Sequence, residues 1–247
     1  MKIRYMSDLH LEGTAMGIGN PEGHDVLVLA GDIGVQGCDK EFMRRAKGMF
    51  PHVLRVLGNH EYYRGDFIET VRIYEALCAS AGVTLLHRQQ VHIGGVQFIG
   101  ATMWTDFRNG NALDMLRASQ FMRDYEVIKI NGRRLSPEDT LREHYKDVTY
   151  LRSTLSNPAW TDKRVVITHH CPGVQYTAPW YQSTPETSAF VSDQPRLVSK
   201  ANVWIFGHTH YNIYTTTESG TRVVSNQRGY RHEYANIGFD PYAHIEL

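Results

Sequence analysis

The stretch Gly207-His208-Thr209-His210 directly follows the apolar run Val203-Trp204-Ile205-Phe206. An unbroken apolar run of this kind predicts a strand that is buried on both faces. The turn after it carries two histidines separated by one residue, and in an extended or tightly turning segment both imidazoles point the same way. They can therefore reach one metal ion or two adjacent ions. Paired histidines are also common on surface turns, so the interpretation depends on the rest of the chain.

Four other apolar runs also end in polar side chains that bind metals. Residues 3–7 lead to Asp8 and His10, residues 26–30 to Asp32, residues 53–57 to Asn59 and His60, and residues 164–168 to His169 and His170. Because the carboxyl ends of parallel strands meet at one edge of a sheet, we expect all five clusters to lie together. Carboxylate, amide and imidazole ligands suit manganese, iron or zinc, and they argue against copper(I) or an iron–sulfur cluster.

The composition indicates a soluble globular chain. The 247 residues include 26 basic and 26 acidic side chains, and this balance argues against an extended nucleic-acid track. The three cysteines are odd in number and widely spaced, so they indicate neither a disulfide framework nor a zinc finger. No signal region precedes the first strand, and no apolar run approaches the roughly 20 residues that span a bilayer. We expect a cytoplasmic protein without a membrane segment.

The hydrophobic periodicity predicts helices over 40–49, 66–81, 113–121 and from Ser136 to about 156, with Asp39 as the cap of the first and Gly82 as the stop of the second. Residues 91–100 read as a hairpin that turns at Gly94-Gly95, and 171–195 as a long irregular loop. Strands and helices alternate early and hairpin strands dominate late, which predicts an α/β protein with sheets sandwiched between helices. We predict one domain, 1–247, with a lid-like insertion over 107–145.

The ordered blocks have a known counterpart. Asp8-x-His10, Gly31-Asp32, Gly58-Asn59-His60-Glu61, Thr168-His169 and Gly207-His208-Thr209-His210 together resemble the calcineurin-like metallophosphoesterase superfamily. Each block alone has an ordinary alternative, since Gly-Asp commonly caps a turn, but the blocks occur in family order from residue 8 to residue 210. Residues 100–105 and 226–230 also resemble a bacterial and phage subgroup of uncertain substrate. The resemblance implies a β-sandwich of two mixed sheets flanked by helices, with a dinuclear metal centre.

The resemblance assigns a role to each matching residue. Asp8, His10 and His210 would bind one metal ion, Asn59, His169 and His208 would bind the other, and Asp32 would bridge the two. His60 matches the histidine that contacts the scissile phosphate and acts as general acid. Glu61 would lie behind the ligands, and His170 would either lie behind them or face the substrate. Asn59, His60 and, more weakly, Arg228 would contact the substrate, although Arg228 could equally pair with a surface carboxylate.

The chemistry of phosphate esters explains why two ions are needed. Two cations about 3.5–4 Å apart clamp a phosphoryl group, and they lower the pKa of bound water so that hydroxide is available at neutral pH. Manganese, iron, zinc, nickel and magnesium all suit such a centre, and we favour manganese. The bridging carboxylate of Asp32 takes part in catalysis by holding both ions, whereas His60 needs a proton for the leaving oxygen and so must not be a ligand.

Three functions follow from these residues. The first is a phosphodiesterase that uses metal-bound hydroxide and His60 as general acid. The second is a phosphomonoesterase that acts on small phosphates or phosphoprotein. The third is a non-catalytic scaffold that binds a partner through its metal site, although no ligand of the motif is missing here. We read Trp104, Trp160, Trp180 and Trp204 as packing residues of the core or its edge, and the alternative for Trp180 is stacking on a base or leaving group of the substrate.

Overall fold

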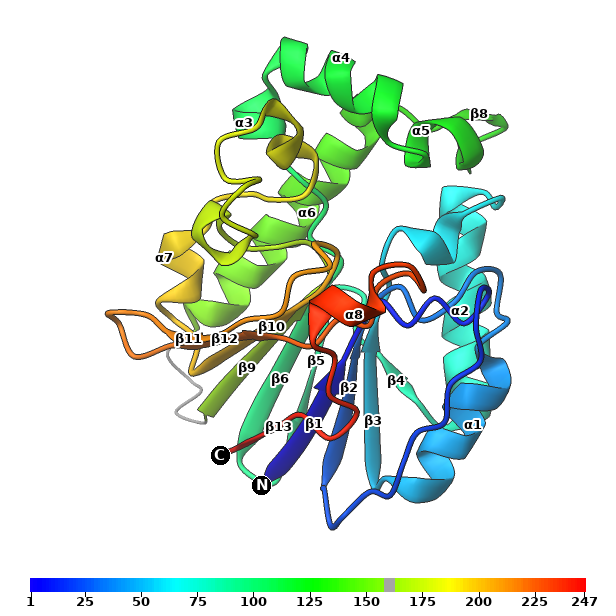
Figure 1. Ribbon diagram of the computed structural model, residues 1–247, viewed down its shortest axis with the longest axis vertical. Helices are drawn as coiled ribbons and strands as arrows, with labels where there is room; N and C mark the ends of the chain where they lie inside the picture. The colour runs from blue at the N-terminus through cyan, green and yellow to red at the C-terminus, as the bar shows by residue number, and fades with distance from the viewer. Residues whose placement is uncertain (158–162) are drawn as a thin grey trace.

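The computed structural model describes residues 1–157 and 163–247, and it contains two β-sheets packed face to face with helices on both outer sides (Figure 1). The first sheet has the order β13 (His244–Glu246), β1 (Lys2–Met6), β2 (Val26–Ala30), β3 (His52–Val56) and β4 (Thr84–Leu85). The second has the order β11 (Tyr214–Thr216), β12 (Arg222–Ser225), β10 (Val203–Phe206), β9 (Lys163–Thr168), β6 (Val96–Ala101) and β5 (Gln89–Ile93). The predicted α/β sandwich of two mixed sheets is confirmed.

The central strands of both sheets are parallel, and this arrangement brings their polar ends together. In the first sheet β1 pairs in parallel with β2, and β2 pairs in parallel with β3. In the second sheet β9 lies in parallel register between β6 and β10. Each of β1, β2, β3, β9 and β10 therefore ends at the same edge of the sandwich, as expected for parallel strands.

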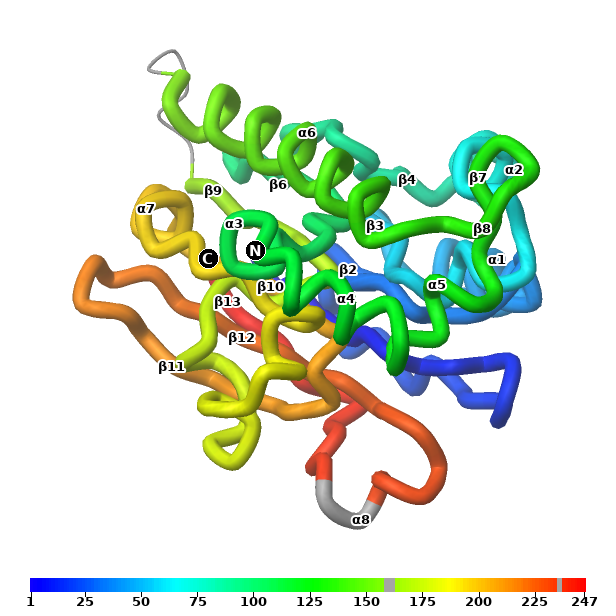
Figure 2. Tube along the Cα trace, turned by 90° about the horizontal axis from the view of Figure 1, so that it is seen from above, coloured from blue at the N-terminus to red at the C-terminus, as the bar shows by residue number. Residues whose placement is uncertain are grey.

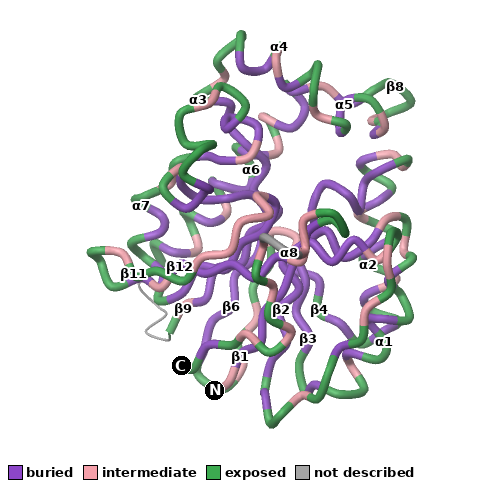
Figure 3. The backbone as a smooth tube through the Cα atoms, viewed as in Figure 1, coloured by how far each residue is buried: buried purple, intermediate pink, exposed green. Residues whose placement is uncertain are grey.

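Alternate residues of each strand face opposite sides, and both sides are apolar. Ile3 and Val28 of the first sheet and Val165 and Ile205 of the second belong to the cluster between the sheets. The outer face of the first sheet packs on α1 (Lys40–Met49) and α2 (Phe67–Ala81), and the outer face of the second packs on α6 (Pro137–Leu155) and α7 (Pro195–Val198). Figure 3 shows the resulting pattern, with buried strands inside exposed helix surfaces.

The segment between β6 and β9 covers the edge where the parallel strands end. Before α6 it contains α3 (Phe107–Gly110), α4 (Ala112–Phe121), α5 (Asp124–Val127), β7 (Lys129–Ile130) and β8 (Arg133–Arg134). Figures 1 and 2 place α4 and α5 over this end of the sandwich. Two backbone hydrogen bonds fasten the segment to the turn after β3, from Arg64 N–H to Val127 O (3.1 Å) and from Lys129 N–H to Gly65 O (2.9 Å).

Most predicted boundaries are confirmed. The observed helices α1, α2, α4 and α6 coincide with the predicted ranges to within two residues, Gly82 ends α2 in the left-handed conformation (φ 70°), and the Gly94-Gly95 turn joins β5 to β6. The loop 171–195 contains two short 3₁₀ turns, η2 (Val174–Tyr176) and η3 (Pro185–Ala189). No helix in the two described ranges is long and apolar enough to cross a membrane.

One prediction about a side chain is wrong. Asp39 makes no side-chain cap to α1, because its carboxylate is hydrogen-bonded to the buried guanidinium of Arg55 instead. Trp104 and Trp204 are buried in the core, whereas Trp180 is 70% exposed and contacts the rings of Tyr181 and Tyr211 at the surface. The fourth tryptophan, Trp160, lies outside the described residues.

A buried ionic cluster joins the two strand ends at the centre of the first sheet. Arg55 of β3 binds the carboxylates of Asp39 and Glu61 (Nη2 to Oε1 of Glu61 2.7 Å), and all three side chains are fully buried. Glu61 lies in η1 (His60–Tyr62), and its oxygens also accept the backbone N–H groups of Gly58 (2.7 Å), Asp32 (3.0 Å) and Ile33 (2.8 Å). One carboxylate thereby ties the turn after β2 to the turn after β3.

Replacing Arg55 with methionine is expected to lower the free energy of unfolding by about 3–5 kcal/mol, because the buried carboxylates of Asp39 and Glu61 lose their cation. Urea unfolding followed by circular dichroism measures the change. The matched control is Arg44→Met, which breaks the exposed pair between Arg44 and Glu41 and should cost about 0–1 kcal/mol. Equally small losses for both variants would contradict the structural role of the buried cluster.

Candidate metal centre

Glycines at the ends of the strands allow the predicted ligands to approach one another. A Cβ atom on Gly58 would lie 2.1 Å from Oδ1 of Asp32, and a Cβ atom on Gly207 would lie 2.6 Å from Oδ2 of Asp8. Any larger residue would collide with a carboxylate at these two positions. The glycines of the Gly-Asn-His and Gly-His-Thr-His blocks are therefore required by the close packing of turns from different strands.

Five of the predicted ligands have a strained backbone. Positive φ angles occur at Asp8 (52°), His10 (46°), Asp32 (53°), His208 (73°) and His210 (48°). Residues with a Cβ rarely adopt this left-handed region, and such outliers cluster at functional sites where the surrounding structure holds them in place. Here the turns are held by hydrogen bonds from the backbone N–H of His208 to Asp8 (3.0 Å) and from that of His60 to Asp32 (2.8 Å).

The first group of converging side chains consists of Asp8, His10 and His210, whose potential ligand atoms all lie within 4.8 Å of one another. Nε2 of His210 lies 3.1 Å from Nε2 of His10 and 3.5 Å from Oδ1 of Asp8. The opposite nitrogen of His210, Nδ1, donates to the carboxylate of Glu233 at 2.7 Å. This contact directs the lone pair of Nε2 toward the other two side chains.

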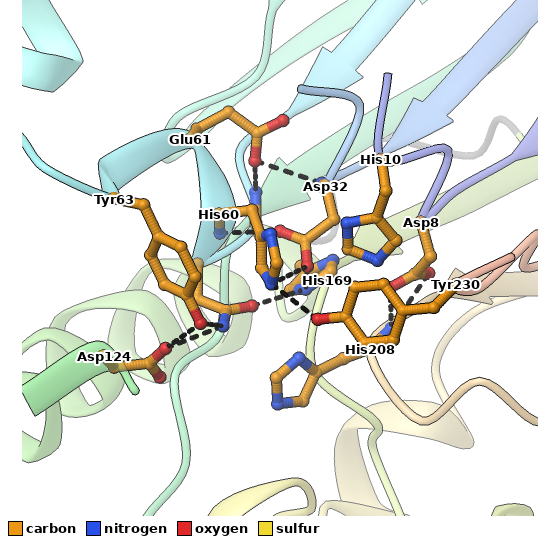
Figure 4. A network of polar contacts seen from close by, with 12 residues as sticks. Asp8, His10, Asp32, His60, Glu61, Tyr63, Asp124, His169, His208 and Tyr230 are labelled. Atoms are coloured by element: carbon orange, nitrogen blue, oxygen red, sulfur yellow. Dashed lines mark hydrogen bonds and ion pairs between the residues drawn. The ribbon is translucent and has the colours of Figure 1, made fainter. Parts of the chain in front are cut away.

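The second group consists of Asp32, His169 and His208, which meet the same 4.8 Å limit. Nδ1 of His169 donates to the carbonyl oxygen of Ala30 (2.9 Å), and Nε2 lies 3.4 Å from Oδ2 of Asp32. Oδ1 of Asn59 approaches the same Nε2 at 3.1 Å, so the predicted amide ligand joins this group. Figure 4 shows Asp8, Asp32, His169 and His208 directed toward a common centre.

The donor atoms fit divalent cations. Because the carbonyl of Ala30 can only accept, Nδ1 of His169 carries the hydrogen, and Nε2 of the neutral ring is a lone pair that faces the oxygens of Asn59 and Asp32. Nε2 of His208 is buried and has no hydrogen-bond partner among the described residues. Lone pairs that converge in this way repel one another unless a proton or a metal ion lies between them.

The pKa values reflect the same excess of electron-pair donors. Burial lowers the pKa of His169, but the neighbouring Asp32 carboxylate more than offsets this effect, and the pKa rises to about 9. Burial also lowers the pKa of His210, but hydrogen bonds to Asp8 and Glu233 raise it to about 10. These two rings therefore hold protons where bound cations would supply the positive charge instead.

His60 lies beside both groups but belongs to neither of them. Its Nδ1 is 3.1 Å from the carboxylate of Glu12, its Nε2 is 3.0 Å from the hydroxyl of Tyr230, and the ring stacks on Tyr63 with centroids 4.1 Å apart. Nε2 also lies 3.9 Å from Oδ2 of Asp32. His10, Glu12 and His60 form a further convergent group within 4.8 Å, in which the Glu12 carboxylate accepts a hydrogen bond from Nδ1 of His60.

Several contacting residues were missed by sequence reasoning because no motif contains them. Asp124 of α5 accepts hydrogen bonds from the amide nitrogen of Asn59 (2.8 Å) and from the hydroxyl of Tyr63 (2.9 Å). Glu12 contacts His10 and His60, Tyr230 contacts His10, His60 and His210, and Glu233 contacts His210. Tyr230 alone carries a sequence signal, because it lies in the segment 226–230 that resembles the family subgroup.

Two further predicted residues occupy positions outside the groups. One nitrogen of Arg228 donates to the carbonyl oxygens of Leu9 (3.1 Å) and Thr14 (2.9 Å), and the guanidinium lies over the ring of Tyr234. His170 is buried behind His208, with ring centroids 4.1 Å apart, and burial lowers its pKa to about 3. Its substrate-facing alternative has no support in this placement.

Comparison with known proteins agrees with this geometry. The profile of the family Calcineurin-like phosphoesterase matches residues 1–212. The chain is 28% identical over 283 residues to an uncharacterized protein of Acanthamoeba polyphaga mimivirus, a match that covers 99% of this chain and 96% of that protein.

Two solved structures are similar in fold. A phosphopantetheinyl hydrolase from Mycobacterium tuberculosis superimposes with a TM-score of 0.78 at 17% identity. The match covers 99% of this chain and 95% of the hydrolase chain. A dimetal phosphatase from Danio rerio superimposes with a TM-score of 0.55 at 12% identity. The match covers 92% of this chain and 87% of the phosphatase chain. Since the family profile spans most of the chain and includes every predicted ligand, the chain belongs to the calcineurin-like phosphoesterase family and is a metal-dependent phosphoester hydrolase.

Proposed function

We propose that this hydrolase cleaves phosphodiesters and that His60 protonates the leaving oxygen. The position of His60 carries the proposal, because its ring lies 3.9 Å from Asp32 while its nitrogens are held by Glu12 and Tyr230. An imidazole beside a dinuclear centre, but outside both ligand groups, is free to carry a proton to the substrate.

The ligand assignment follows the two convergent groups. Asp8, His10 and His210 would hold one divalent ion, Asn59, His169 and His208 would hold the second, and Asp32 would lie between them. When bound, the two ions would clamp the phosphoryl group and acidify water, and we expect manganese to serve best. The chain itself contributes the fixed placement of these side chains at the strand ends.

The surroundings of His60 favour its protonated form. Burial lowers the pKa of His60, but the carboxylates of Asp32 and Glu12 more than offset burial, and the net effect is a raised pKa. Glu12 accepts the hydrogen of Nδ1, which leaves the proton on Nε2 for the leaving oxygen. Tyr230 stacks on His10 and its hydroxyl contacts Nε2, so this phenol holds the ring in place.

The charges at the centre support a diester more than a monoester. In the described part of the chain, the ion pairs of Asp8 and Asp32 are formed with histidines, and Arg228 binds backbone carbonyls. A phosphomonoester carries about two negative charges near neutral pH, as phosphorylated side chains do, and would benefit more from a free guanidinium than a singly charged diester. A phosphomonoesterase is the alternative that experiment must separate from the diesterase.

An aromatic pair formed by the exposed Trp180 and the half-buried Tyr211 supports a nucleotide as one class of diester. The rings of Trp180 and Tyr211 meet edge to face with centroids 6.0 Å apart, and Tyr211 directly follows His210. Exposed aromatic rings stack on bases without strict sequence preference. We further propose that residues 1–247 form a single domain in which 107–145 is an insertion covering the metal centre.

Metal-stripped protein should hydrolyse neither p-nitrophenyl phosphate nor bis(p-nitrophenyl) phosphate, and manganese should restore activity with at least about tenfold higher kcat/KM on the diester, a difference of about 1.4 kcal/mol in activation free energy. Zinc, nickel and magnesium are tested in parallel. A preference for the monoester would support the phosphatase alternative. Bound metal without activity on either ester would support the scaffold.

His60→Asn should lower kcat on a diester by about 10²–10⁴-fold while two equivalents of metal remain bound, because general acid catalysis is lost and the ligand groups are kept. The loss should be smaller for nitrophenyl than for alkyl leaving groups, which need a proton more. Metal content by elemental analysis and kcat are compared with those of His52→Asn, a variant at an exposed histidine. Loss of one metal ion in His60→Asn would show that His60 is a ligand.

Tyr230→Phe should lower kcat by about tenfold or less on alkyl diesters, because the ring still stacks on His10 but no longer holds Nε2 of His60. This loss lies at the lower end of the range of about 10–100-fold that is typical of residues that orient metal-site groups through hydrogen bonds. The loss should shrink on nitrophenyl diesters. Tyr145→Phe, at a tyrosine of α6 that is 49% exposed, is the matched control. An equal loss on both leaving groups would contradict a role through His60.

A further inference from the structure

The amide of Asn59 can bind a cation through one of its two ends only. Its oxygen is an electron-pair donor, whereas its NH₂ group is a hydrogen-bond donor and repels a metal ion. The two orientations of an asparagine amide have almost the same shape. Something other than packing must therefore decide which end faces His169 and Asp32.

Two hydrogen-bond acceptors at the nitrogen end of the amide determine its orientation. Nδ2 of Asn59 donates to Oδ1 of Asp124 at 2.8 Å and to the hydroxyl of Tyr63 at 3.3 Å, and that hydroxyl itself donates to Oδ1 of Asp124 at 2.9 Å. A carboxylate has no hydrogen to donate. If the amide were reversed, its oxygen would face the Asp124 carboxylate, which cannot donate to it, in a site where both side chains are only 2% exposed.

The acceptor comes from a distant part of the chain. Asp124 lies in α5, 65 residues after Asn59, within the insertion that covers the strand ends. The backbone hydrogen bonds of Arg64 with Val127 and of Lys129 with Gly65 hold α5 against the turn that follows β3. Figure 4 shows Asp124 and Tyr63 side by side at the margin of the ligand groups.

We propose that Asp124 is a positioning residue that points the Asn59 oxygen at the second metal ion, so that the insertion forms a fixed wall of the metal site. The proposal rests on the assignment of Asn59 as a ligand. It predicts a selective effect. Loss of Asp124 should weaken binding of the second ion and leave the affinity of the Asp8, His10 and His210 site unchanged.

The test is manganese binding by the full chain. In Asp124→Leu the second equivalent should bind about 10–100-fold more weakly than in the wild type, while the first keeps its affinity. Equilibrium dialysis with elemental analysis counts the ions, and electron paramagnetic resonance should show a mononuclear signal in place of the coupled dinuclear one. An unchanged second affinity in Asp124→Leu would overturn the proposal.

Two companion variants separate positioning from general damage. Tyr125→Phe removes a buried hydroxyl from the same helix, whose partner is Thr140 (3.0 Å), and should keep both ions. Asp124→Asn retains an oxygen that can accept from Asn59, so it should bind the second ion more tightly than Asp124→Leu. Equal weakening in Tyr125→Phe would show that disturbance of α5, and not the hydrogen bond, is responsible.

Asn59→Leu distinguishes failure of this proposal from failure of the ligand assignment. If Asn59→Leu loses the second ion and Asp124→Leu does not, only the positioning role is refuted. If Asn59→Leu also keeps both ions, the assignment of Asn59 is wrong. If Asp124→Leu does not fold, Tyr63→Phe takes its place, because it removes one acceptor of the Asn59 amide and the donor to Asp124. This variant must still weaken binding of the second ion, and an unchanged affinity would overturn the proposal.

Discussion

The carboxylate of Glu61 is the group on which the rest of the site depends. It accepts backbone N–H groups from Asp32 and Ile33 after β2 and from Gly58 after β3, and it is neutralised by Arg55 from inside the sheet. Adjacent parallel strands do not by themselves fix the turns that follow them. With both turns bound to one buried carboxylate, Asp32 and Asn59 emerge at set positions, and the other ligands are arranged around them.

The metal centre stores unfavourable interactions that bound cations would relieve. Five of the proposed ligand residues have left-handed backbone angles, His208 has a buried nitrogen without a partner among the described residues, and the electron-pair donors of Asp32, Asn59 and His169 converge on one point. A folded chain tolerates such a site because the surrounding sandwich is held by large apolar clusters. Metal binding therefore adds to folding stability, since the ligands are assembled only in the native state.

Two walls around His60 come from opposite ends of the chain. The turn after β1 supplies Glu12, and the segment after β12 supplies Tyr230, while the insertion supplies Asp124 behind Asn59. A ligand cluster alone would serve equally well as a storage or structural site. The placement of an imidazole between a carboxylate and a phenol, next to Asp32, which we propose as the bridging ligand, is the feature that favours catalysis.

The sequence by itself determined the α/β sandwich, the long helices and the convergence of Asp8, Asp32, Asn59, His169 and His208 at one edge. Short continuous apolar runs that end in turn residues favour buried strands, and parallel strands bring their carboxyl ends together. Only the tertiary structure showed that Asp39 pairs with Arg55 and that Asp124, Glu12 and Tyr230 complete the site. These contacts join residues 16, 65, 48 and 170 positions apart. No local periodicity or turn preference encodes them, because they depend on how the sheets and the insertion pack against one another.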